Sequence, residues 1–436
     1  MTSPSPAPDI SRAEAAEGSP SAPAGGWPNP RRGFLFFIGF SAIGAGIGQL
    51  APAVLTLPLK AAEIDPKGQA TVLSIAIGVG SLLALVAYPL FGRLSDRTTW
   101  RLGRRRPFLI LGAILVALGA VLEFTANSTL TLTLAATVIL LGAAAAVVSN
   151  TAIIPDQIEP LRRGPASALV GVSLPVGAVI GLFVAQLIPT SLAWEIFAPA
   201  VLSIIGILLF AIVLKDRAIT KEERPPFGVV AFFSTFWTNP VKNPNFAWAW
   251  FSRLLIFFGV AAVQAYQVFY LIVRLHFSPQ SVGGAVFLTT LVLTVFALVF
   301  APIAARISDR IGRRKPFVVV AAVIFAIGLA VASTANSFPA FLVAMGIIGV
   351  GQGVYFAVDL ALVSQVLPDP DNPAKDMGIF GLASSLPSSI VPAVAPAILL
   401  IGASAANPQN YPALFIAGAI AGIVGALLIL PIRKVR

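Results

Sequence analysis

The sequence predicts an all-α membrane protein with twelve transmembrane helices in two six-helix pseudo-repeats. Hydrophobic residues make up 57% of the 436 residues, charged residues only 11%, and the mean hydropathy is +0.90. Apolar runs of about 20 residues, the length that crosses a bilayer core, recur along the chain. The runs are continuous and do not alternate, so helices and not barrel strands are expected to satisfy the backbone in lipid. A loop motif also occurs twice, once in each half.

Polar and charged stretches separate the twelve apolar runs. We expect the spans at 33–59, 70–91, 107–125, 130–154, 166–188, 194–214, 247–273, 282–307, 316–335, 338–367, 377–401 and 411–430.

Four regions follow from this division. Residues 1–32 are rich in Pro, Ala, Ser and Gly, which predicts a disordered cytoplasmic tail. Residues 33–214 form the first six-helix bundle and 246–436 the second. The linker 215–245 is polar except for an apolar stretch at 227–237, which is too short to span and is expected to lie along the cytoplasmic interface.

The repeat is visible in the loops. The segment GRLSDR at 92–97 reappears as ARISDR at 305–310, and the segment LGRRRPF at 102–108 reappears as IGRRKPF. The aspartates Asp96 and Asp309 are 213 positions apart, and so are Pro155 and Pro368. Equal offsets at two separate landmarks predict duplication of a six-helix unit.

The basic residues predict the orientation. If both termini are cytoplasmic, 25 Lys and Arg residues lie in cytoplasmic segments and three lie outside. Cytoplasmic loops carry such an excess, so the sequence predicts a multi-pass protein of the plasma or inner membrane with both termini inside. The net charge of +11 is explained by these loops, and no nucleic-acid partner is expected. With no cysteine and one histidine, His276, we expect neither a metal site nor a cofactor.

The duplicated loop resembles the signature loop of the major facilitator superfamily. Its form here, with the segment GVYFAVDLAL at 353–362 and KDMG at 375–378, is similar to the branch of sucrose/proton symporters and glycoside-pentoside-hexuronide carriers. The resemblance covers the chain from about residue 33 onward. It implies a secondary transporter, not an enzyme, that works by alternating access on a small solute and protons in the lipid bilayer. We expect it to act as a monomer.

The resemblance also implies a conformational switch. An aspartate of this loop is expected to dock at the start of a helix in the opposite half, where the helix dipole and free N–H groups stabilise a carboxylate. Asp96 would meet the helix start near Asp376, and Asp309 the one near Arg163. The arginine clusters can equally anchor the loops to anionic lipid. The expected switch residues are Gly92, Asp96, Arg97, Arg104, Arg163, Asp309, Arg310, Arg313 and Asp376.

Ionisable residues inside the spans are few and therefore informative. Arg253 and Asp359 are expected about 12–15 Å deep from the cytoplasmic face, at 1.5 Å per residue. They can form a static ion pair, or Asp359 can take up the coupling proton with Arg253 as its counter-charge. Glu123 and Glu195 are expected at outer helix ends, solvated by interfacial water.

Neutral polar and aromatic side chains within the spans are suited to a polyhydroxy ligand. They can also tie helices together by hydrogen bonds. The candidates for solute binding are Gln49, Asn150, Gln264, Gln267, Tyr270, Gln352 and Tyr355.

The leading hypothesis is therefore proton-coupled symport of a sugar or glycoside. The alternative is a proton-coupled drug efflux antiporter of the same fold. The two differ in whether the cavity walls are polar or purely apolar.

Overall fold

The computed structural model describes residues 33–159, 162–188, 191–220, 239–368, 373–403 and 408–432. Over these ranges the chain is helical and contains no strand, and twelve helical segments are long and apolar enough to cross a membrane. The twelve-helix prediction is confirmed. The predicted tail at 1–32 and the interfacial stretch at 227–237 lie outside the described residues.

Each predicted span corresponds to one helical segment. In the first half these are α2 (Phe34–Ala51) continued by η1 (Pro52–Thr56) and α3 (Leu57–Ile64), then α4 (Gln69–Asp96), α5 (Arg106–Thr125), α6 (Thr129–Gln157), α7 (Gly164–Ala185) and α8 (Leu192–Val213). In the second half they are α10 (Pro244–Val273), α11 (Pro279–Ile311), α12 (Lys315–Thr334), α13 (Phe338–Val363), α14 (Pro373–Ser385) with α15 (Pro387–Leu399), and α16 (Tyr411–Ile429).

Two of the spans are interrupted, both at prolines. The first span contains the π-helical turn η1, which begins at Pro52. The eleventh span is divided at Leu386, directly before Pro387, the first residue of α15. Proline lacks the N–H that a continuous helix requires, so both sites are places where a helix can bend.

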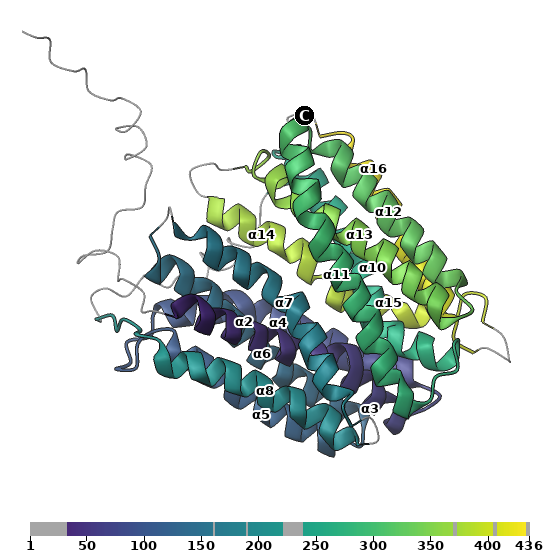
Figure 1. Cartoon of the computed structure of the whole chain (residues 1–436), viewed down its shortest axis with the longest axis horizontal. Coiled ribbons are helices and arrows are strands. Elements are labelled where there is room, and N and C mark those ends of the chain that lie inside the picture. The colour runs from purple at the N-terminus through teal and green to yellow at the C-terminus, as the bar shows by residue number, and fades with distance from the viewer. Residues whose placement is uncertain are drawn as a thin grey trace, which may run out of the picture.

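The same helix pairs pack together in both halves. In the first half α5 packs on α6 and α8, and α4 on α6; in the second half α12 packs on α13 and α16, and α11 on α13. The two groups of helices lie side by side, purple to teal and green to yellow (Figure 1). Glycines allow close approach: a Cβ on Gly353 would collide with the carbonyl oxygen of Ala297 on α11.

The two ends of the bundle differ. At the end where α4 begins and α15 ends, the halves touch each other, and we call this the closed end. There the hydroxyls of Ser74 and Tyr266 are 2.7 Å apart, and Gln409 donates to the carbonyl of Lys67 at 3.1 Å. One apolar cluster continues across both halves, including Leu55 and Val391. The opposite end carries the arginine-rich loops, and we call it the basic end.

Candidate functional site

A cavity of about 940 Å³ lies between the two halves. Side chains of α2, α4, α6 and α7 line it on one side, and side chains of α10, α11, α13, α14 and α15 on the other. Pro155, Arg163 and Ser167, all near the basic end, belong to its wall. Because the halves pack together at the closed end, the cavity extends toward the basic end.

The wall of the cavity is mainly apolar, with polar side chains distributed over both halves, and it is nearly uncharged. Among its lining residues Arg163 is the single charged one, and its guanidinium donates to the carbonyls of Ile158 and Pro155 at the end of α6. The remaining polar groups are amides and hydroxyls: Gln49, Ser81, Tyr88, Asn150, Thr151, Ser167, Ser173, Gln264, Gln267, Thr290, Thr294, Gln352, Ser384, Ser385 and Ser388. Such a surface can exchange hydrogen bonds with a neutral polar molecule.

Five of the seven predicted solute-binding residues line this cavity, namely Gln49, Asn150, Gln264, Gln267 and Gln352. Three of them already have protein partners. Tyr88 donates weakly to Gln49 at 3.4 Å, Ser41 donates to the amide oxygen of Asn150 at 3.0 Å, and Thr289 donates to that of Gln267 at 3.1 Å. The amide nitrogen of Asn150 has no hydrogen-bond partner.

Tyr270 lies elsewhere. It is fully buried, its hydroxyl donates to the carbonyls of Ala332 and Ala335 at 2.8 Å, and its ring stacks on Phe341. Tyr270 is six positions after Gln264 on α10 and therefore lies nearer the closed end. The structure therefore makes Tyr270 a packing residue, and its assignment to the solute site is wrong.

Tyr355 is likewise absent from the wall of the large cavity. Its hydroxyl donates to Asp359 Oδ1 at 2.8 Å within α13, so the residue belongs to a buried charged group.

That group is centred on Arg253 of α10, whose guanidinium donates to Asp359 Oδ2. The side chains of Arg253 and Asp359 are 12% and 7% exposed. The guanidinium also lies over the rings of Phe257 and Phe380, 5.1 and 4.5 Å from their centroids, and reaches Ser384 Oγ on α14 at 3.4 Å. Since α13 ends at Val363, Asp359 is only four positions from its helix end, closer than expected.

The ion pair lies directly behind the cavity wall. Phe257, Phe356 and Ser384 line the cavity, and two of them also contact Arg253. Sequence reasoning identified the two charged partners but missed Ser384 and Phe257. Phe257 is four positions after Arg253 on α10, a spacing that places both on one helix face, so this neighbour was open to prediction.

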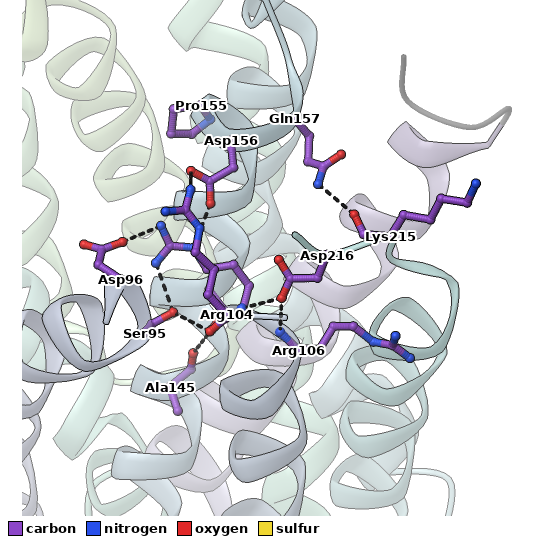
Figure 2. A network of polar contacts seen from close by, with 12 residues as sticks. Ser95, Asp96, Arg104, Arg106, Ala145, Pro155, Asp156, Gln157, Lys215 and Asp216 are labelled. Carbon is purple, nitrogen blue, oxygen red and sulfur yellow. Dashed lines mark hydrogen bonds and ion pairs between the residues drawn. The ribbon is translucent and has the colours of Figure 1, made fainter. Parts of the chain in front are cut away.

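A second network of charges holds the basic end of the first half (Figure 2). Arg105 donates to Asp156 at 2.8 Å and to Ser95 at 3.0 Å, and forms an ion pair with Asp96 at 2.6 Å. Burial lowers the pKa of Arg105, but the hydrogen bonds and charges of Asp156 and Asp96 outweigh it, so the pKa is raised above its ordinary value. Arg104 also pairs with Asp156.

The linker joins this network. The carboxylate of Asp216 accepts the backbone N–H groups of Arg105 and Arg106 at the start of α5 (Figure 2). Gly103, at φ +96°, lies beside it, and a Cβ there would collide with the Asp216 carboxyl group. Asp156 and Asp216 were not predicted as network members, although Asp156 directly follows Pro155, which is part of the repeat.

The predicted switch residues are all at the basic end. Asp96 pairs with Arg105 of its own half and Asp309 with Arg314 of its own half, at 2.9 Å. Arg310 and Arg313 are exposed, Gly92 faces Val148, and Asp376 is buried in the first turn of α14. Arg105 is only 4% exposed, so it serves the network and does not anchor to lipid.

No group of three or more His, Cys, Asp or Glu side chains suited to a metal occurs in the part of the chain that the structure describes.

Comparison with known proteins identifies the architecture. Residues 33–301 and 287–436 match the sequence profile of the Major Facilitator Superfamily. A search of curated protein sequences finds no relative.

Three solved structures share the fold. A point mutant of the nucleoside transporter NupG is 13% identical, with a TM-score of 0.71 over 92% of this chain and 100% of that one. A point mutant of the peptide transporter POT, in complex with alafosfalin, is 15% identical, with a TM-score of 0.67 over 97% of each chain. A bacterial homolog of the human lysosomal transporter Spinster, inward-facing and unoccupied, is 16% identical, with a TM-score of 0.66 over 91% of this chain and 94% of that one. At these identities the likeness concerns the fold.

Proposed function

Since the chain belongs to the Major Facilitator Superfamily, we propose that it is a proton-coupled symporter of a small neutral polar solute, a sugar or a glycoside. Family and structural neighbours indicate a transporter and not an enzyme. The solute class and the coupling are our inference from the site.

The observation that carries the proposal is the composition of the cavity wall. It offers amide and hydroxyl groups from both halves with aromatic surface at Tyr88, Phe257 and Phe356, and a single charge at its basic-end rim. An anionic solute would favour a cation deep in the cavity, and a lipophilic cation a carboxylate in apolar walls. Neutral donors and acceptors suit hydroxyl groups. The similarity of the segment at 353–362 to glycoside carriers supports the same class.

Asp359 is the proposed proton acceptor. Its ion pair with Arg253 lies behind the wall that the solute would touch, and the same guanidinium reaches α14 through Ser384. Protonation of Asp359 removes the charge that holds Arg253, so the guanidinium is free to re-partner. The contact between Arg253 and α14 would then depend on the charge state of Asp359. A coupled carrier needs such a link between protonation and conformation.

The conformation supports alternating access. The closed end is sealed between the halves, and the cavity extends toward the basic end. With the orientation predicted from the basic residues, we infer that this conformation is the inward-open form. We propose that Asp96 and Asp309 exchange their present partners Arg105 and Arg314 for helix starts of the opposite half, near Asp376 and Arg163, when the basic end closes.

Uptake of a labelled disaccharide and glycoside panel into proteoliposomes, with and without an inward proton gradient, tests the proposal. We expect gradient-driven accumulation that a protonophore abolishes. Asp359→Asn should lose accumulation but retain solute exchange without a gradient, whereas Ser364→Ala, on an exposed site beyond the end of α13, should behave as the native protein. Gradient-driven movement of dyes or drugs in the opposite direction, with no sugar accumulation, would instead support the efflux antiporter.

A further inference from the structure

Two glutamates at the closed end are buried against expectation. Glu123 is in the last turn of α5 and Glu195 in the first turn of α8, and they are only 1% and 3% exposed. The prediction that interfacial water solvates them is wrong, because η1 and the helices beside α8 cover these helix ends. Neither residue belongs to the cavity or to the Arg253–Asp359 group.

Glu123 has partners that stabilise its charge. The hydroxyl of Thr56 in η1 donates to Glu123 Oε1 at 2.6 Å. Lys60 of α3 is close enough to interact with it electrostatically, although its ammonium group is 3.0 Å from Glu63 Oε2. All of these partners belong to the first half.

Glu195 differs from Glu123 in its hydrogen bonding and in the half of the molecule that it faces. Its Oε1 has no hydrogen-bond partner. A Cβ on Gly283 would lie 3.6 Å from that oxygen and 3.8 Å from Leu55 Cδ2, so the oxygen faces α11 of the second half across the seam between the halves.

The surroundings of Glu195 provide little compensating charge. The elements packed against α8 are α2, α5, α7 and η1, with α11 across the seam. Of these, α2, α7, η1 and the part of α11 before Arg306 contain no charged residue, and the facing end of α5 contributes Glu123. The nearby α3 adds Lys60 and Glu63. A carboxylate with an unpaired buried oxygen is costly in such a place, whereas a carboxylic acid is tolerated.

We propose that Glu195 is a proton-binding site of the closed end, which holds a proton while the two halves are packed there and releases it to the water on that side when the end opens. The proton enters and leaves from the same side, so this site senses pH and moves no net charge across the membrane. Acid on that side then favours the closed end, and alkaline conditions favour its opening. The inference uses alternating access but not the identity of the solute or of the coupling residue.

The test measures opening directly. Because the natural chain has no cysteine, Asn127→Cys and Gln280→Cys provide two unique labelling sites, exposed at the closed end on opposite halves. Spin labels on both, in the full-length protein in lipid nanodiscs without solute, report the distance between the halves from about pH 5.5 to 8.5. We expect the ratio of long to short distances to rise with pH, by up to about tenfold per pH unit for one linked proton.

Matched variants test whether Glu195 causes the pH dependence of the distance between the halves. Glu195→Gln should keep the short distance at all pH values, while Glu123→Gln should retain the native pH response. Gly283→Ser places a hydroxyl near Glu195 Oε1, which can donate to the carboxylate, so the end should stay closed to higher pH. This variant tests the proposal independently if Glu195→Gln does not fold. A native distance independent of pH, or a native response in both Glu195→Gln and Gly283→Ser, overturns the proposal. Asp359→Asn should leave this response intact even if it abolishes uptake, so failure of the transport proposal is distinguishable.

Discussion

The first and fourth helices of each half meet in a polar contact, and the two contacts are chemically different. In the first half, Ser41 of α2 donates to Asn150 of α6 at 3.0 Å, a neutral hydrogen bond. In the second half, the corresponding α10 and α13 are joined by the ion pair of Arg253 and Asp359. The position 213 residues before Asp359 holds Ala146. The packing of these helices is therefore alike in both halves, while at this contact only the second half carries charge.

At the loops of the basic end, in contrast, the buried charged residues are in the first half. Arg105 of the first half is buried among Asp96, Asp156 and Ser95. Its counterpart Arg314 pairs with Asp309, whose side chain is 64% exposed. The first half is thus tied together by charges at its surface loop and the second half in its interior. We infer that protonation of Asp359 can alter helix contacts inside the second half, whereas protonation of Glu195 acts at the seam between the halves.

Removing one partner of the buried ion pair should lower stability more than any other change considered below. Arg253→Met leaves the Asp359 carboxylate buried without its counter-charge and should lower the free energy of unfolding by about 3–5 kcal/mol. Thermal unfolding in detergent measures this. The double variant Arg253→Met with Asp359→Leu should recover most of the loss. A double variant as unstable as the single one would show that the pair does not account for the effect.

The loop arginines should differ by a smaller amount. Arg105→Gln removes contacts to three buried or half-buried partners and should cost about 3 kcal/mol, because Asp156 loses one of its two cations while Asp96 and Ser95 lose a partner. Arg314→Gln at the equivalent position removes an exposed pair, worth about 0–1 kcal/mol. Unfolding midpoints of the two variants compare the halves directly, and equal losses would contradict the assignment of the stronger network to the first half.

The loop glycines Gly103 and Gly312 also differ between the two halves. Gly103 and Gly312 both have positive φ, +96° and +67°, so alanine is strained at each. A Cβ on Gly103 would also collide with Asp216, whereas one on Gly312 meets nothing within 4 Å. We expect losses of about 2–3 kcal/mol for Gly103→Ala and about 1 kcal/mol for Gly312→Ala. If the two variants unfold alike, the contact between the linker and α5 contributes nothing to stability.

The neutral contact between α2 and α6 should contribute less than the buried ion pair between α10 and α13. Ser41→Ala removes the donor to Asn150 and should lower stability by about 1 kcal/mol. Ser149→Ala is the control, because the hydroxyl of Ser149 bonds only to the carbonyl of Ala145 in its own helix. A loss as large as that of Arg253→Met would mean that the polar contacts in the two halves are energetically equivalent.

Much of the fold was predictable because the membrane restricts the choices. Lipid requires complete helices of known length, so the twelve spans could be placed within a few residues of their observed ends. The charged pair was predictable as well, since Arg253 and Asp359 are rare charges inside spans. The split of the eleventh span at Leu386 was less visible, because several prolines occur there and only packing decides which of them interrupts the helix.

The polar residues of the site were harder to assign. Gln264 and Tyr270 lie on the same helix with similar chemistry, yet one lines the cavity and the other is bonded to the carbonyls of Ala332 and Ala335. A buried polar group always needs a partner, and the sequence does not reveal whether that partner is a solute or a backbone carbonyl.

Hydropathy, repeated loops and rare ionisable residues are local properties, so the sequence was sufficient to predict the helix count, the repeat and the two charges inside the second half. Which surfaces meet depends on the tertiary structure. It directed the cavity toward the basic end, buried Arg105 but not Arg314, and left Glu195 facing Gly283 across the seam. The reason is that burial and pairing depend on helices far apart in the chain, whose relative positions no single segment encodes.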